Sequence, residues 1–311
     1  MLIRRASLLV SLIVATPSLP RLSAPILASR DSTPIKTTAL ASATIASASS
    51  APATSIVDSL QIFYIGRPAG WEHYELKPTE GGDGVMITSD YDYVDRGRRN
   101  HSALVMSVAN DYAIRKFEQF RITDSARTVT TSVEFDGTHA KMLRNNKTTD
   151  VTIPAVAYVV SSYSPTAQHL GLIRYWEAHG MPKTIAIVPG DPNPVTIRKL
   201  GIDSVGTGAN RIKLTRYTID GVIWGINYLW LDSEGRLAMF ATGGGGGLSF
   251  KTVRAALVPL RDELMDVATR AQMVELTRIA TKTKPIAEGF VALVGATLID
   301  ATGAPAIPNS T

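Results

Sequence analysis

The sequence predicts an α+β protein that is mainly antiparallel β, with a curved sheet or half-barrel around a central helix and a second helix near the C-terminus. Short runs of alternating apolar and polar residues recur from 58 to 155, separated by Gly, Asn and Asp. One helical pattern interrupts them near residue 170, and another follows a run of five glycines. Alternation with frequent turns is typical of antiparallel meanders, sandwiches and barrels.

The first 28 residues have the features of an export signal. Arg4 and Arg5 precede an apolar run at 6–15, and small residues follow it. A bilayer span needs about 20 apolar residues, and Pro17 interrupts this run. We therefore expect removal of 1–28 and a periplasmic or secreted protein without a stable membrane span. A membrane anchor is the alternative.

Residues 29–56 are rich in Ala, Ser and Thr and contain no aromatic residue, which predicts a disordered linker. Residues 1–56 hold five basic residues and one acidic residue, a net +4 of the chain's +5, which leaves +1 for 57–311. This nearly neutral region gives no indication of a nucleic-acid partner. The absence of cysteine excludes disulfides and thiolate sites.

We expect one β-rich domain over 57–281. Near its start, SLQIFYIG and GWEHYEL flank the turn-forming RPA and predict a hairpin. In DYDYVDRGRR, alternation places Asp90 and Asp92 on one face of a strand and Tyr91 and Tyr93 on the other. We interpret this segment as a solvated strand, because its spacing lacks the glycine and terminal glutamate of a calcium loop.

A central helix is predicted over 165–179. Ser164 suits the N-cap, Pro165 the first helical position and Gly180 the position after the C-cap. Ser162, Ser164 and His169 also have the residue types of a nucleophile and its base, but no GxSxG elbow is present. We therefore interpret Ser164 as a helix cap.

Strands resume after this helix. The stretch 211–242 predicts two or three strands, with bends at Gly221 and Gly225. The five-glycine run is interpreted as a flexible loop, because no GK[ST] follows it as a phosphate cradle requires. A second helix is predicted over 252–280, with Pro259 bending or delimiting its start.

The segment GFVALVGATLIDATGAPAIPNST ends the sequence. From Gly295 to Gly303 it matches G-A-x-[LV]-[IV]-D-G-T-G, with Ala301 in place of a glycine. Over 286–308 it resembles the start of secreted metal-dependent amidohydrolases, in which such a strand opens a small β-sandwich beside a catalytic TIM barrel. We therefore interpret 282–311 as a connector and the first sandwich strand. The alternative is one more strand of the preceding sheet.

This resemblance implies a hydrolase of amide-like C–N bonds that uses a divalent metal such as zinc. The family's metal ligands lie downstream of the matching strand, whereas the five histidines of this chain all precede it. We therefore expect that the catalytic barrel is missing from this chain. The expected partner is a downstream catalytic barrel. The chain alone should be inactive, with no catalytic, cofactor-binding or metal-binding residue.

A second resemblance implies an alternative function. The segment IGRPAGWEHYEL, through Gly70, Glu72 and Tyr74, resembles the first hairpin of exported half-barrel domains such as periplasmic lipoprotein carriers. It implies a non-enzymatic binding module for an apolar ligand or lipid on the concave face of the sheet. We expect a Glu and Tyr pairing across strands, with His73 on the face opposite to Glu72 and Tyr74. The candidate ligand-binding residues are Glu72, Tyr74, Trp224 and Trp230.

Overall fold

The computed structural model describes residues 54–144, 146–160, 165–188, 194–223, 225–243, 250–285, 289 and 291–311. The chain divides into two units, 1–45 and 46–311, and every described residue belongs to the second. The expected export signal and most of the expected linker therefore lie outside the described residues. In the described part of the chain, no helix combines the length and apolar composition that crossing a membrane requires.

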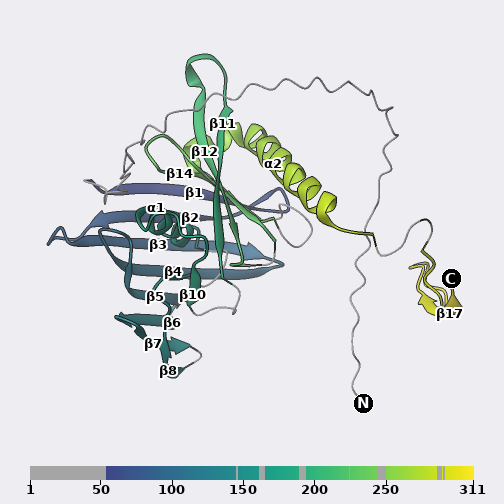
Figure 1. The fold of residues 1–311 in the computed structure, drawn as a ribbon, viewed down its shortest axis with the longest axis horizontal. Helices are drawn as coiled ribbons and strands as arrows, with labels where there is room; N and C mark the ends of the chain where they lie inside the picture. Colours follow the sequence, from purple (N-terminus) through teal and green to yellow (C-terminus); the bar gives the residue numbers. More distant parts are fainter. Residues whose placement is uncertain are drawn as a thin grey trace, which may run out of the picture. The chain divides into compact units, whose positions relative to one another are not determined.

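One open antiparallel sheet of thirteen strands is the main feature of the described structure (Figure 1). The first eight strands are β1 (Ile56–Tyr64), β2 (Arg67–Pro78), β3 (Gly84–Asp95), β4 (Arg98–Ala109), β5 (Ile114–Ile122), β6 (Arg127–Asp136), β7 (His139–Arg144) and β8 (Lys147–Thr152). The other five are β11 (Thr196–Val205), β12 (Ile212–Asp220), β13 (Asn227–Leu231), β14 (Leu237–Ala241) and β15 (Phe250–Arg254). Their spatial order is β11-β12-β13-β14-β15-β1-β2-β3-β4-β5-β6-β7-β8, so β15 joins the two series by pairing with β1.

The segment between the two series carries the central helix. It contains β9 (Ala157–Val159) and β10 (Ala186–Val188), which pair in parallel, and α1 (Ala167–Ala178) between them. The predicted helix is confirmed, although it begins two residues after Pro165. Gly180 has a φ of +75°, and Met181 N donates to Trp176 O at 2.8 Å, as expected for a glycine that ends a helix.

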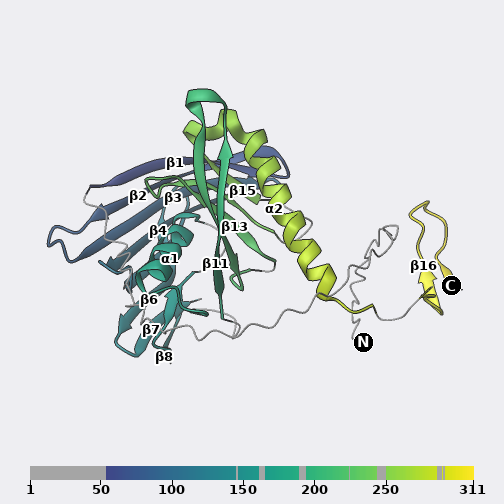
Figure 2. The ribbon, with the colours of Figure 1, turned by 45° about the horizontal axis from the view of Figure 1, so that its top comes forward.

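Two hydrophobic clusters lie on opposite faces of the sheet, one including α1 and the other including α2 (Arg261–Lys282). Figures 1 and 2 show the two helices beside the sheet. Along β13, Leu229 and Leu231 belong to the cluster that includes α1, whereas Tyr228 and Trp230 belong to the cluster that includes α2. Successive strand residues point to opposite faces. The half of the sheet around β13 is therefore covered by a helix on each face.

The second helix begins later than predicted. Phe250–Arg254 forms β15 between β14 and β1, and Ala255–Leu260 is a 3-10 helix that contains Pro259. The α-helix then runs over Arg261–Lys282. The predicted helix over 252–280 is wrong for 252–254, because pairing on both sides draws these residues into the sheet, and 255–260 is 3-10 rather than α-helical. Pro259 delimits the start of α2, as expected from its missing N–H.

Glycines and one isoleucine shape the turns. The stretch 211–242 holds three strands, and Gly221 and Gly225 have positive φ between β12 and β13, as predicted. The first hairpin turns at Ile65 and Gly66, whose φ values are +49° and +75°. The predicted turn at RPA is wrong, because these residues already belong to β2. Two central residues with positive φ match the twist of a two-residue hairpin.

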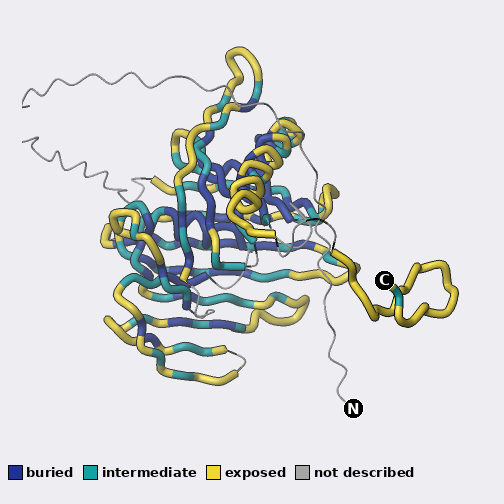
Figure 3. Tube along the Cα trace, turned by 45° about the vertical axis from the view of Figure 1, so that its right-hand side comes forward, coloured by how far each residue is buried: buried dark blue, intermediate teal, exposed yellow. Residues whose placement is uncertain are grey.

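The last described residues form a separate hairpin of β16 (Ala296–Leu298) and β17 (Ile307–Ser310). In the described part of the chain, these strands pair with each other and not with the thirteen-stranded sheet. The alternative of one more strand in the preceding sheet is therefore wrong. Figure 3 shows that this segment is almost entirely exposed.

Candidate functional site

Glu72 lies on β2 with its side chain fully buried against the start of α1. Thr166 N donates to Oε2 of Glu72 at 2.7 Å, and Ala167 N donates to Oε1 at 2.9 Å. Ser89 Oγ, on β3, donates to Oε1 at 2.9 Å. A carboxylate in this position satisfies N–H groups that have no partner within the helix. Glu72 therefore caps α1 from the sheet, whereas Ser164, the expected cap, lies outside the described residues.

The environment of Glu72 acts on its pKa in two opposing directions. Burial raises the pKa, because the carboxylate loses its hydration. Hydrogen bonds from Ala167, Thr166 and Ser89 lower it, and the net result is a raised pKa. Glu72 also stands directly opposite Tyr91 across β2 and β3.

His169, one turn into α1, has no exposed surface. Its ring lies 4.6 Å from the ring of Phe240, centroid to centroid. Burial lowers the pKa of His169 to about 3, and backbone groups of Thr166 and Pro165 oppose the shift only in part. The ring is therefore neutral at physiological pH and packs as part of the core. Ser162 and Ser164, its expected partners, lie outside the described residues.

Tyr74 follows Glu72 on the same face of β2 and is 2% exposed. It stands opposite Asp58, which lies 3.3 Å from Nε of Arg254. Nη1 of Arg254 donates to Oδ2 of Asp232 at 2.7 Å, and Nε donates to the carbonyl of Leu237 at 2.9 Å. Burial, followed by the charge of Asp58, raises the pKa of Tyr74. This buried network joins β1 to β15 and to the turn after β13.

Trp230, one of the two tryptophans of the predicted site, does not join this group. Trp230 is fully buried in the cluster beneath α2, and its indole N–H donates to Oδ2 of Asp203 at 2.8 Å. Trp224 lies outside the described residues. The structure thus places Glu72 and Tyr74 on one face of the sheet and Trp230 on the other. They do not surround one ligand.

The concave face, where the alternative function would place an apolar ligand, is occupied by α1. Nine of its twelve residues are buried: Ala167, Gln168, His169, Leu170, Gly171, Leu172, Ile173, Tyr175 and Trp176. At Gly171, an added Cβ would lie 2.3 Å from the hydroxyl of Tyr158. The helix is therefore packed too closely against its surroundings for a ligand to lie between them at this point.

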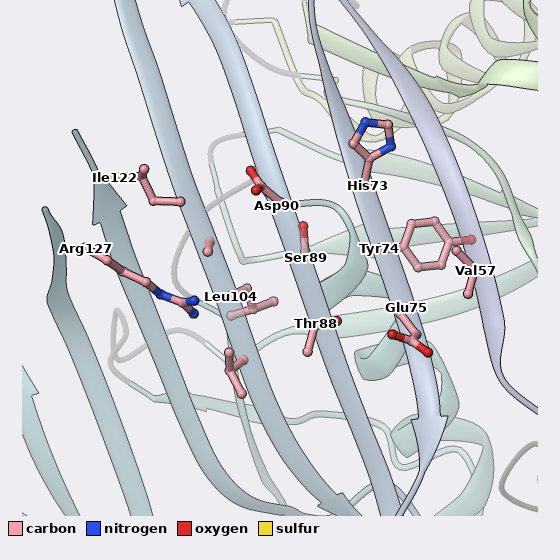
Figure 4. Close-up of a pocket in the computed structure, with 12 residues that line it drawn as sticks. Val57, His73, Tyr74, Glu75, Thr88, Ser89, Asp90, Leu104, Ile122 and Arg127 are labelled. Carbon is pink, nitrogen blue, oxygen red and sulfur yellow. The ribbon is translucent and has the colours of Figure 1, made fainter. Parts of the chain in front are cut away.

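Hollows lie instead over the first series of strands. One of about 370 Å³ crosses β1–β6 and is shown in Figure 4. Its exposed or half-buried lining side chains include Val57, His73, Glu75, Thr88, Asp90 and Arg127. A second, of about 450 Å³, is lined by residues that include Arg98, Arg99, Asn100, His101, Gln119 and Arg121. Ile122 lines both, so the two hollows adjoin.

His73 and Asp90 line the first hollow from the face that is opposite to α1. Their neighbours Glu72, Tyr91 and Tyr93 are buried on the α1 side. The predicted alternation of aspartates and tyrosines in this strand is therefore confirmed, as is the separation of His73 from Glu72. Among the described residues, no three His, Asp or Glu side chains are grouped so that they could hold a metal ion.

Comparisons with known proteins add no assignment: no family model matches the chain, and the searches of curated proteins and of solved structures found no match.

Proposed function

We propose that this chain is the exported accessory region of an amidohydrolase-type hydrolase that acts on amide-like C–N bonds. In this proposal, the β-rich domain over 57–281 precedes an enzyme domain that opens within 282–311. The observation that carries the proposal is the terminal hairpin, which holds the amidohydrolase-like residues and pairs outside the thirteen-stranded sheet.

The turn after β16 agrees with the residue pattern of that family. Ala301 occupies the position at which the pattern has glycine, and its φ is +59°, a conformation that glycine adopts most easily. Oδ1 of Asp300 accepts hydrogen bonds from Thr302 N at 3.0 Å and from Thr302 Oγ1 at 2.7 Å. These bonds lower the pKa of Asp300. The order Asp300, Ala301, Thr302 thus has a local physical reason.

The apolar side chains around this turn are exposed, which supports the proposal that further strands pack against this hairpin. Six large hydrophobic residues are between 49% and 77% exposed: Val291, Leu293, Val294, Leu298, Ile299 and Ile307. An isolated two-stranded hairpin is at best marginally stable in water. Burial against further strands of a β-sandwich would remove these side chains from water.

The experiment is to tag the natural gene product and measure its intact mass in the exported fraction of its native cells. A mass well above that of 29–311 is expected, and the longer protein should contain a divalent metal and hydrolyse amide-like substrates. Loss of hydrolysis with a chelator, and its return with zinc, would assign the activity to a metal barrel. A mass that matches the chain without its leader would contradict the proposal.

A further inference from the structure

A small hollow of about 100 Å³ lies between the sheet and the start of α2. Residues of β1 and the turn after it, of β15 and of α2 line this hollow: Phe63, Gly66, Lys251, Val253, Arg261, Asp262 and Met265. It shares no lining residue with the two larger hollows. A water molecule in the liquid occupies about 30 Å³. The small hollow therefore has room for a group of only a few heavy atoms.

Lys251 brings an amine to this hollow. It stands opposite Phe63 of β1 and Ala241 of β14, and both of these belong to the cluster that includes α2. Directly opposed residues share a face, so Lys251 lies on the α2 face of the sheet, where it is only 7% exposed. Within the described part of the chain, its amine has no hydrogen-bonding or acidic partner. A buried ammonium group without a counter-ion is unfavourable.

Arg261 brings a second positive charge to the same hollow. The Cζ atom of its guanidinium lies 5.3 Å from the ring centroid of Phe63, the residue that stands opposite Lys251. Burial, followed by the charge of Arg261, lowers the pKa of Lys251. Like charges that are close together repel each other, and an anion between them would remove this repulsion.

The acidic residues at the start of α2 do not neutralise Lys251. Asp262 lines the hollow, but its side chain is 87% exposed, and its Oδ1 accepts hydrogen bonds from Nε and Nη2 of Arg261 at 2.9 Å and 2.8 Å. Oε2 of Glu263 accepts a hydrogen bond from Gly206 N at 2.8 Å. Asp262 therefore balances part of the charge of Arg261, whereas the charge of Lys251 is left without a counter-ion among the described residues.

We propose that this hollow binds a small oxyanion, a carboxylate or a phosphate group, between Lys251 and Arg261. Ammonium and guanidinium groups both form charge-assisted hydrogen bonds with such oxygens. The apolar side chains of Phe63, Val253 and Met265 complete the lining, and electrostatic attraction is stronger in such surroundings than in water. This site is independent of the proposed hydrolase function, because it uses none of residues 282–311.

The test uses the full chain, with inorganic phosphate and acetate as probes and chloride at the same ionic strength as the reference. A ligand that binds only the folded state stabilises it increasingly as its concentration exceeds the dissociation constant. At about 100 times that constant, the midpoint of thermal unfolding should rise by about 5 °C or more above the chloride reference. Titration calorimetry should show one saturable site. The probe with the lower dissociation constant identifies phosphate or carboxylate as the preferred oxyanion.

Variants separate this site from general effects of salt. Lys251→Met should be as stable as the native chain in chloride, because it removes a buried charge that has no partner, and its affinity for the anion should fall about tenfold or more. Arg261→Gln, at a partly exposed position, should also weaken binding about tenfold. Lys183→Met removes an exposed lysine and should leave binding unchanged. Absence of saturable stabilisation by both anions, or an equal response of the Lys251→Met protein, would overturn the proposal.

Discussion

Strands β13 and β2 belong to the same sheet but differ in how many faces are covered. Every residue of β13 is buried, because one helix packs on each face. In β2, buried Glu72 and Tyr74 alternate with exposed Trp71 and His73. A strand that is covered on both faces reads as a continuous apolar run, and a strand covered on one face alternates. The difference identifies the surface that remains available for binding.

β15 shows how polar residues enter the doubly covered region. Its sequence FKTVR is buried at every position, including Lys251, Thr252 and Arg254. Arg254 is paired with Asp58 and Asp232, and the Oγ1 atoms of Thr252 and Thr166 are 3.2 Å apart. Buried polar groups are tolerated when they are paired. Polar residues in this strand therefore do not indicate an exposed face.

The largest effect should come from the two tryptophans of these regions. We expect Trp230→Ala to lower the free energy of unfolding by about 3–5 kcal/mol, because it opens a cavity in the core. Asp203 would also lose a hydrogen bond. Trp71→Ala should cost less than about 1 kcal/mol, since its side chain is partly exposed. Urea denaturation measures both, and equal losses would contradict the comparison.

Removal of the buried arginine should have the next largest effect. Arg254→Met leaves Asp58 and Asp232 without their shared cation, and we expect a loss of about 3 kcal/mol. Arg236→Met removes a more exposed cation that also contacts Asp232 and should cost less than about 1 kcal/mol. The free energy of unfolding at neutral pH, measured for both variants, tests the contrast.

The pH dependence of stability should distinguish two buried carboxyl groups. Burial alone would raise the pKa of Asp232, but hydrogen bonds from Arg236 and Arg254 lower it. Asp232 therefore stabilises the fold above its unfolded pKa of about 4, and this stability is lost as the pH falls through its folded pKa. In the Asp232→Asn variant, the free energy of unfolding should fall less steeply as the pH is lowered below about 4. An unchanged acid limb would show that Asp232 does not contribute to it.

Glu72 should behave in the opposite sense. Its pKa is raised in the folded protein, so stability from this group is highest below its unfolded value of 4.5 and declines as the pH rises to the folded pKa. Glu72→Gln removes this slope and costs about 1–2 kcal/mol, because an amide has one acceptor oxygen for three donors. Glu75→Gln, on the opposite face of β2, is the control. If the Glu72→Gln variant keeps this decline of stability with rising pH, another group is responsible for it.

The smallest effect should be a gain of stability. Ile65 is 70% exposed and has a φ of +49°, which is unfavourable for a β-branched residue. Ile65→Asn should raise the free energy of unfolding by about 1 kcal/mol. Ile202→Asn, at an exposed position of β11 without positive φ, should give no gain. The midpoint of thermal unfolding compares the two variants.

The structural elements that depend on local sequence pattern could be predicted from the sequence. Alternation predicted the antiparallel sheet, and helix signals predicted α1 with its glycine at Gly180. Sequence reasoning could not predict contacts between distant residues, such as the capping of α1 by Glu72, which lies 94 residues from Thr166. It also missed the contacts of Trp71 with His73 and His101, because cross-strand register brings Trp71 and His101 together. The available signal was that His, Trp and Asp residues occupy the alternate positions of adjacent strands that face solvent.

The pairing of β15 with β1 has a consequence for how the chain acquires its fold. Within the sheet, the series β11–β15 lies beside the series β1–β8, and each series follows the order of the chain. The two series meet where β15 pairs with β1, with Arg254 opposite Leu60. During synthesis, β1 presents an unpaired edge until almost two hundred further residues have followed it. Contacts between residues so distant in sequence form slowly, and open edges favour association between chains. A circularly permuted chain that begins at β11 and joins the segment after α2 to β1 would place β15 and β1 much closer together in sequence, so that they could pair early.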